Sequence, residues 1–229
     1  MGEFDLGVIQ RSLPYLWSGM VYTLGLTSLA MVVGIGGGTL LAVARLASFK
    51  PLAWLAALYV NLMRSVPLVL VIFWFYFLVP LLVQGLTGAA QPQAISAEQT
   101  ALVSFSLFEI AFYCEIMRAG IQSIPNGQQS AARAMGLTYW QQLQYVILPQ
   151  AFRNMLPILL SQTIVLFQDT SLVYVISVTD FLGAAAKIAQ RDSRLLELYL
   201  FAAVVYFVIS LALSRLVRSL QKRMRVAVS

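Results

Sequence analysis

The chain has 229 residues, of which 60% are hydrophobic and only 10% are charged, and its 15 Lys and Arg against 9 Asp and Glu give a net charge of +6. A soluble domain carries about a quarter charged residues, so this composition excludes a water-soluble globular protein. The chain has no histidine and one cysteine, Cys114, which excludes histidine acid–base chemistry, histidine metal sites, an internal disulfide and a multi-cysteine metal cluster.

Long charge-poor runs predict membrane-spanning helices, each of which needs about 20 apolar residues. Residues 13–44 and 198–214 carry no charge, and residues 51–97 carry only Arg64. We expect an all-α integral membrane protein with one transmembrane domain, 1–229, and five spanning helices. The second is too long for one straight span, and Pro67 and Pro80 are expected to kink or divide it. The predicted helices lie near residues 18–44, 53–84, 99–118, 154–177 and 196–216.

The two ends of the chain are predicted to lie on opposite sides of the membrane. Residues 1–12 contain Glu3, Asp5 and Arg11, the reverse of a basic signal-peptide start, so the first helix is expected to stay attached. Apart from Arg64, which lies inside a predicted helix, the Lys and Arg residues divide ten to four between the two sides, which predicts an outside N-terminus and a cytoplasmic C-terminus. The ten are Arg45, Lys50, Arg118, Arg133, Arg153, Arg215, Arg218, Lys222, Arg223 and Arg225, and the four are Arg11, Lys187, Arg191 and Arg194.

Two further patterns describe the membrane part. Gly34 and Gly38 have the spacing of small residues that let helices pack closely. The run from Arg215 to Arg225 indicates an anchor on anionic lipid rather than a nucleic-acid patch.

The loop of residues 122–153 is the most informative segment. Pro125-Asn-Gly127 predicts a turn, residues 128–135 favour a short helix, and Gly136 is expected to end it. This helix would present Ala131 and Ala132, which let another backbone approach closely, beside the cation Arg133. An amphipathic helix resting on the membrane surface is the alternative explanation.

The same loop resembles the signature of the permease subunits of ATP-binding-cassette (ABC) importers. That signature has an acidic residue, two alanines, three residues, a glycine, nine residues, an aliphatic residue, one residue, and then leucine–proline. The matching residues are Ala131, Ala132, Gly136, Val146, Leu148 and Pro149, and Ser130 departs from the pattern at the acidic position. The resemblance implies the type I importer permease fold and a cytoplasmic coupling loop, residues 122–153, that docks on a cytoplasmic ATPase through Ser130, Ala131, Ala132, Arg133, Gly136, Leu148 and Pro149.

Further blocks are similar to those of the polar amino acid importers (histidine and glutamate/aspartate type), with glutamate/aspartate importer permeases the nearest group. The resemblance implies a bacterial cytoplasmic (inner) membrane location and four partners: ABC ATPase subunits, a second permease chain (similar or identical), an external substrate-binding protein and an amino acid. The blocks that resemble those of the polar amino acid importers are Arg64-Ser-Val-Pro67, Glu115 to Ile121, Ile124 to Gln128, Leu148 to Ala151 and Phe167 to Tyr174.

The chain is predicted to be a transporter subunit and not an enzyme. No G-x-x-x-x-G-K-[ST] phosphate loop occurs in the sequence. The chain itself is therefore expected to hold no cofactor, and ATP and Mg²⁺ would be bound by the partner ATPase.

Three charges fall inside predicted spans: Arg64, Glu109 and Asp169. Buried charges in membranes face partners or polar paths. Asp169 could hold a substrate ammonium and Arg64 its carboxylates, or Arg64 could simply neutralise Asp169 or Glu109. Glu109 is expected to be a structural partner, and Glu115 and Arg118 a local helix pair. The predicted substrate path comprises Arg64, Gln162, Gln168, Asp169, Thr170 and Ser171.

Two other functions compete with an ATP-driven importer. An ion-coupled secondary transporter of a small polar solute would use the buried charges as its ion site, although five helices without an inverted repeat do not favour it. An intramembrane enzyme would need a Ser–Lys pair or paired acids, and the lysines lie outside the predicted spans.

Overall fold

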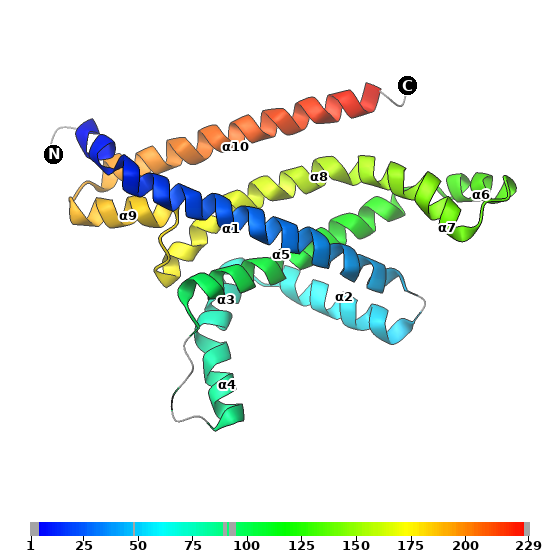
Figure 1. Cartoon of the computed structure of the whole chain (residues 1–229), viewed down its shortest axis with the longest axis horizontal. Coiled ribbons are helices and arrows are strands. Elements are labelled where there is room, and N and C mark those ends of the chain that lie inside the picture. The colour runs from blue at the N-terminus through cyan, green and yellow to red at the C-terminus, as the bar shows by residue number, and fades with distance from the viewer. Residues whose placement is uncertain (1–4, 48, 89–90, 92–94, 227–229) are drawn as a thin grey trace.

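The computed structural model describes residues 5–47, 49–88, 91 and 95–226, with side chains described as far as Lys222. In this part of the chain all regular secondary structure is helical (Figure 1). Five helical segments are long and apolar enough to cross a membrane, as the charge-poor runs predicted. These segments are Leu6–Leu46, Leu68–Thr87, Ala97–Gln122, Tyr139–Ile176 and Leu195–Lys222.

The first helix, α1 (Leu6–Leu46), begins well before residue 18, where the hydropathy run placed its start. Asp5 has extended backbone angles, and its Oδ1 accepts a hydrogen bond from the Gly7 amide at 2.7 Å. This N-cap satisfies an amide that would otherwise lack a partner. The helix therefore extends through the polar residues that precede the apolar run.

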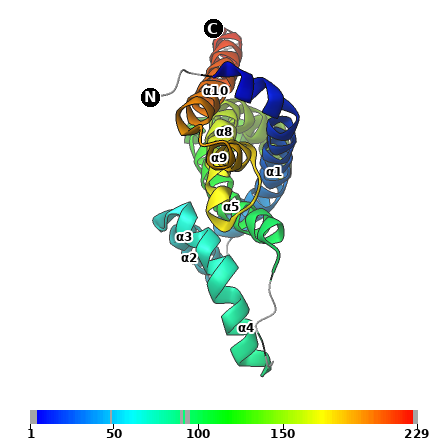
Figure 2. The same ribbon diagram turned by 90° about the vertical axis from the view of Figure 1, so that its left-hand side faces the viewer.

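The second predicted span is divided at Pro67. Helix α2 (Lys50–Ser65) ends before it, and Val66 is extended at φ −116° and ψ 136°, as expected for a residue that precedes proline. Helix α3 (Leu68–Phe73) follows, then the π-helical turn η1 (Trp74–Leu78) and α4 (Val79–Thr87). Pro80 lies in the first turn of α4, where proline is tolerated, so it does not break the segment. Figure 2 shows α4 standing away from the rest of the bundle.

Helix α5 (Ala97–Gln122) lies at the centre of the bundle and contacts α1, α2, α3 and α8. Its crossing with α1 depends on glycines: a Cβ at Gly34 would lie 2.7 Å from the Tyr113 ring, and a Cβ at Gly38 would lie 2.8 Å from the Cys114 amide nitrogen. The close packing predicted from the spacing of Gly34 and Gly38 is therefore present, against α5.

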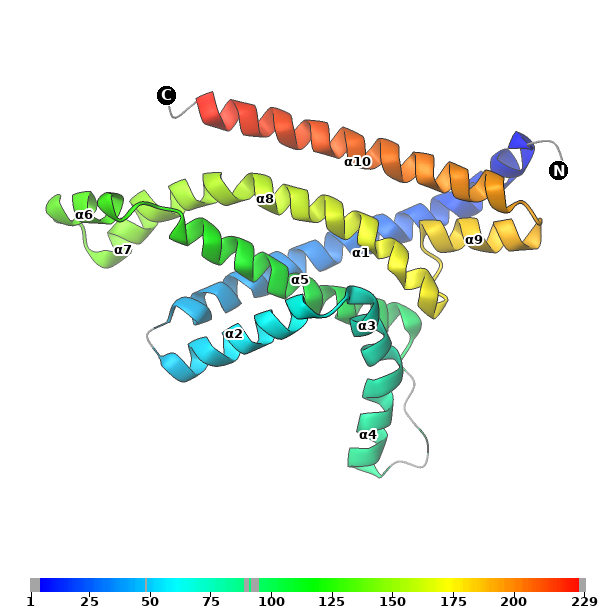
Figure 3. The same cartoon turned by 180° about the vertical axis from the view of Figure 1, so that it is seen from behind.

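The second half of the chain forms two long helices joined by a short one. After the π-helical turn η2 (Leu143–Ile147), α8 (Leu148–Asp169) runs from the α6–α7 end of the molecule toward the α9 end, where the 3₁₀ turn η3 (Thr170–Ile176) follows it (Figure 3). Helix α10 (Leu195–Val226) then runs back along α8. The observed bounds differ from the predicted 154–177 and 196–216, since helical geometry continues beyond the apolar runs.

Helix α9 (Phe181–Arg191) was not predicted and lies in a segment that we expected to be a loop. Buried Asp180 caps it by accepting from the Gly183 amide at 2.8 Å and the Leu182 amide at 3.1 Å. Its alanine-rich face packs on α1 and α10. Burial raises the pKa of the Asp180 carboxyl to about 6.

Candidate functional site

The loop between α5 and α8 folds into two short helices, α6 (Asn126–Ala134) and α7 (Tyr139–Gln142). The predicted stop at Gly136 is present: this residue has a left-handed φ of +78°. The Gly136 amide donates to the Arg133 carbonyl at 2.9 Å, and the Leu137 amide donates to the Ala132 carbonyl at 3.2 Å. These two bonds close the helix in the manner of a glycine C-cap.

The two halves of the permease signature lie side by side in this loop. Ile124, before α6, forms a small buried cluster with Ile147 and Ala151 at the start of α8. The Gln150 side-chain amide also donates to Gln128 Oε1 at 3.3 Å. The nine residues between Gly136 and Val146 therefore lie within one folded segment, residues 124–151, which we call the α6–α7 unit.

The surface of this unit is polar, small and aromatic. Ala132 is buried, whereas Ser130, Ala131 and Arg133 are exposed. Beyond the helix, Met135 is 70% and Trp140 72% exposed, and Tyr139 and Tyr145 are exposed as well. Leu148 and Pro149 lie in the first turn of α8 and are also exposed. The unit projects at the end of the molecule where α5 ends and α8 begins (Figures 1 and 3).

The intramembrane charges form two separate groups, and the first surrounds Glu115. Its Oε2 lies 2.6 Å from Arg45 Nη1 and 3.7 Å from Arg64 Nη1. The Glu115–Arg118 pair predicted from their spacing is also formed. The alternative in which Arg64 neutralises Asp169 or Glu109 is not what the structure shows: its carboxylate partner is Glu115, because α2 lies against the face of α5 that carries residue 115.

The second group lies between α5 and α8. Glu109 is only 1% exposed, and its two oxygens accept from the Gln162 side-chain amide at 3.1 and 3.3 Å. One turn further, the Tyr113 and Thr163 hydroxyls lie 3.0 Å apart. The side chain of half-buried Asp169 forms no hydrogen bond or ion pair with any residue that the structure describes. Among its neighbours in sequence, Gln168 donates to Ser210 Oγ at 3.0 Å.

The structure does not bring Arg64 and Asp169 together. Glu109 and Glu115 are six residues apart on α5, which puts them about 120° apart around the helix, so the two groups occupy different faces. They also lie toward different ends of the long axis, since Asp169 ends α8 near α9 and Glu115 lies in the half of α5 nearer α6 (Figure 1). Thr170 is buried, and its hydroxyl donates to the Phe167 carbonyl at 2.7 Å; Ser171, after it, is half-buried.

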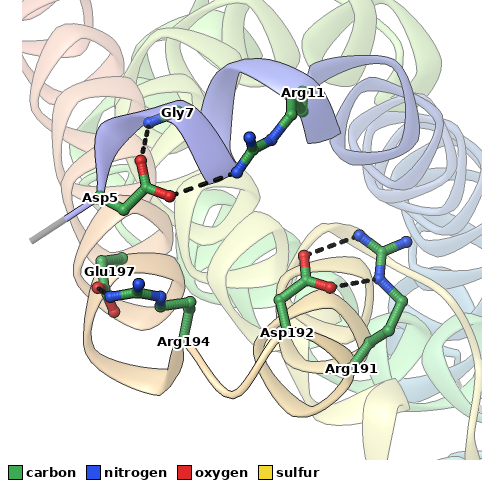
Figure 4. Close-up of polar contacts among 7 residues, drawn as sticks. All are labelled: Asp5, Gly7, Arg11, Arg191, Asp192, Arg194 and Glu197. Atoms are coloured by element: carbon green, nitrogen blue, oxygen red, sulfur yellow. Dashed lines mark hydrogen bonds and ion pairs between the residues drawn. The ribbon is translucent and has the colours of Figure 1, made fainter. Parts of the chain in front are cut away.

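A third set of charges, which the sequence analysis did not pair, lies at the α9 end of the molecule (Figure 4). Asp5 pairs with Arg11 at 3.3 Å, and Arg194 pairs with Glu197 at 3.1 Å. The Arg191 guanidinium makes two hydrogen bonds to Asp192, at 2.7 and 2.9 Å. This contact lowers the pKa of the Asp192 carboxyl. The short spacing between the partners in the sequence could have predicted these ion pairs.

An all-helical membrane bundle with a projecting, glycine-capped loop defines a permease subunit of the type I ABC importer fold. Residues 30–226 match the family of binding-protein-dependent transport system inner membrane components, and the chain belongs to that family. It is thus a multi-pass inner-membrane transporter component, as its signature residues indicated.

Named relatives agree with this assignment. The glutamate/aspartate import permease protein GltK of Escherichia coli O6:H1 (strain CFT073) is 55% identical over 97% of this chain and 99% of that protein. The probable glutamine ABC transporter permease protein GlnM of Bacillus subtilis (strain 168) is 36% identical over 86% of this chain and 89% of that protein.

Solved structures share the fold. A chain from the crystal structure of an amino acid ABC transporter with histidines superposes with a TM-score of 0.87 at 32% identity, covering 96% of this chain and 98% of that one. A chain of the inward-facing MetNI methionine ABC transporter gives a TM-score of 0.62 at 19% identity, covering 94% of this chain and 99% of that one, a similarity of fold alone.

Proposed function

We propose that this chain is the permease subunit of an ATP-driven importer of glutamate and aspartate. The observation that carries this proposal is the 55% identity to GltK, which extends over 97% of this chain and 99% of that protein. Because a permease of this kind has no ATPase of its own, ATP and Mg²⁺ would be held by separate ATPase subunits.

The α6–α7 unit is the proposed docking point for the ATPase. Exposed small residues, Ser130 and Ala131, let a partner surface approach closely, and the neighbouring aromatic side chains supply rigid contact area of the kind enriched in interfaces. The serine at the usual acidic position removes one polar contact, while the packed core beneath the loop is independent of it.

Orientation follows from this docking and from the distribution of cations. The α6–α7 end would face the cytoplasm, where most of the Lys and Arg residues of the loops lie, in agreement with the positive-inside rule. The α9 end would then face outward and receive the substrate-loaded binding protein. A second permease chain, a similar subunit or another copy, would complete the path.

The substrate would meet the two charge groups in succession rather than together. Asp169, half-buried and with its side chain unpaired among the described residues, provides a carboxylate for the ammonium group, and Gln162, Gln168, Thr170 and Ser171 are the polar residues near it in sequence. Arg64, closer to the α6–α7 end, provides a guanidinium for a carboxylate. ATP and the loaded binding protein would favour different states of the same bundle, and their alternation would drive transport inward.

Reconstitution tests the proposal. The permease, its ATPase and its binding protein are placed in proteoliposomes, and uptake of labelled glutamate is measured with and without ATP. Uptake that needs both ATP and the binding protein supports the importer. Uptake driven by an ion gradient alone, with no ATP, would instead establish the secondary transporter.

A further inference from the structure

Glu115 is shared by three guanidinium groups that come from three helices. Arg45 belongs to the last turn of α1, Arg64 to the last turn of α2, and Arg118 to α5 itself. All of them lie within ion-pair distance of the one carboxylate. With three positive charges and one negative charge, this arginine cluster keeps a charge of +2.

The three arginines do not hold Glu115 equally. Arg45 donates to Oε2 at 2.6 Å, and Arg118 donates to both oxygens, to Oε2 through Nε at 3.2 Å. Arg64 Nη1 remains 3.7 Å from Oε2, too far for a hydrogen bond. The Glu115 carboxylate is thus satisfied by Arg45 and Arg118, while the planar donor edge of Arg64 makes no hydrogen bond with any residue that the structure describes.

Arg64 is nevertheless held in place. Its guanidinium carbon lies 5.5 Å from the centroid of the Phe112 ring, one turn before Glu115 on α5. An aromatic ring attracts the flat face of a guanidinium and leaves the N–H edge free. The Arg64 side chain is 39% exposed, the largest value in the cluster. Arg64 therefore presents donors in an accessible place, beside a carboxylate that attracts it without binding it.

We propose that the arginine cluster is the carboxylate-binding site through which an acidic amino acid leaves the permease, and that Glu115 is a built-in competitor that keeps this site weak. The proposal depends on the proposed function, since it requires an acidic substrate. The side-chain carboxylate of the substrate, which glutamine lacks, takes the open donors of Arg64, while Glu115 remains with Arg45 and Arg118. Because the Glu115 charge offsets part of the cluster's attraction, the substrate binds and is then released. A transport path needs such weak binding, since a tight site would stop the flow.

A purely structural role predicts something different. If the cluster only clamped α1, α2 and α5 together, loss of the Glu115 charge would weaken the assembly and reduce the binding of every substrate to a similar degree. A competitor, by contrast, gives a gain of binding when its charge is removed, and only for ligands that carry the extra carboxylate. The sign of the effect and its dependence on substrate charge separate the two roles.

The test uses the permease assembled with its ATPase subunits and its second permease chain in nanodiscs. The binding protein is left out, and equilibrium binding of labelled L-glutamate and L-glutamine is measured. The two ligands differ by one carboxylate. Glu115→Gln keeps the shape of the side chain and removes its charge. We expect about fivefold tighter glutamate binding, the upper range for one partly exposed charge pair, and unchanged glutamine binding. Glu98→Gln, the same change on the exposed first turn of α5, is the matched control and should alter neither.

A second variant decides the matter if Glu115→Gln does not assemble. Arg64→Gln leaves the Arg45–Glu115–Arg118 contacts intact and should weaken glutamate binding about fivefold without changing glutamine binding. The proposal is overturned if Glu115→Gln assembles and leaves glutamate affinity unchanged, or if either variant shifts both ligands equally. If wild-type importer with its binding protein takes up no glutamate, the proposed function itself fails. If the wild-type importer takes up glutamate normally, but the Glu115 and Arg64 variants bind both ligands as the Glu98→Gln control does, the proposed role of the arginine cluster is wrong and the proposed function stands.

Discussion

At the scale of single residues, Gly136 offers a sharp test of the coupling loop. Its φ of +78° is a conformation that costs a residue with a Cβ about 1 kcal/mol or more. Gly136→Ala should therefore loosen the end of α6 and reduce ATPase-coupled uptake, although nothing lies within 4 Å of the added Cβ. Uptake and co-purification of the ATPase are the measurements.

Gly127→Ala is the matched control for that change. Gly127 also has open space around it, but its φ is not in the left-handed region, and it lies in the first turn of α6. The control should keep wild-type uptake. Equal uptake by both variants would show that the left-handed cap is dispensable for coupling.

The residue scale is also where sequence reasoning was weakest. Local pairs such as Glu115–Arg118 follow from spacing along one helix, and this pair was predicted and is present. The partner of Arg64 depends on which face of α5 meets α2, a tertiary feature with no signature in the sequence. The arginine cluster for the same reason could not be predicted, since Arg45 and Glu115 are 70 residues apart.

At the scale of elements, the crossing of α1 and α5 depends on the glycines that face it. A methyl group at Gly34 would lie 2.7 Å from a Tyr113 ring carbon and 2.9 Å from the Glu109 Cβ, so the helices would have to separate. Gly34→Ala should lower stability by about 1–3 kcal/mol, the usual cost of overpacking. Gly36→Ala, with nothing within 4 Å of its Cβ, should leave the melting temperature unchanged or slightly higher. Thermal unfolding of the two purified variants compares them, and equal melting temperatures would contradict the packing argument.

The docking of α9 should depend on pH through Asp180. Burial raises the pKa of this carboxyl to about 6 from an ordinary value of 3.8. A raised folded-state pKa means that its contribution to stability is complete below the unfolded pKa and is lost as the pH rises through about 6. The melting temperature of the wild type should therefore fall between pH 4 and pH 7. Asp180→Asn, which can still cap α9 but carries no charge, should remove this fall; a fall of the same size in Asp180→Asn would assign the pH dependence to another group.

Most of the elements could be predicted because membrane helices follow from hydropathy alone. The predicted helix bounds differ from the observed ones where an N-cap or a proline, rather than hydropathy, determines where a helix begins or ends. Asp5 extends α1 beyond its apolar run, Asp180 starts a helix in a segment that is too short to span, and Pro67 divides a continuous apolar stretch while Pro80 does not. Each depends on a cap or on the position of a proline within a turn.

At the scale of the whole molecule, the fold and the family could be identified from the sequence, because Ala131, Ala132, Gly136, Leu148 and Pro149 stand at the spacing of the permease signature. The shape of the substrate path could not. Polar residues on one helix, such as Gln162 and Asp169, show which face is polar, but not which other helix that face meets or how far it lies from Arg64.

The separation of the α6–α7 unit from Asp169 leads to a prediction about the whole molecule. The unit projects at one end, and α8, whose last residue is Asp169, runs toward the other (Figure 1). Ala131→Trp places a bulky group on the exposed face of α6 and should release the ATPase while the permease remains folded in the membrane. Asp169→Asn should do the reverse: the ATPase remains bound, and glutamate uptake falls at least tenfold, as expected when a buried charged partner of a ligand is lost. Co-purification and uptake are measured for both variants. If the two ends have separate roles, each can be damaged without the other. An Asp169 variant that also loses the ATPase would contradict this separation. An Ala131 variant that retains both ATPase binding and uptake would contradict the docking role of α6.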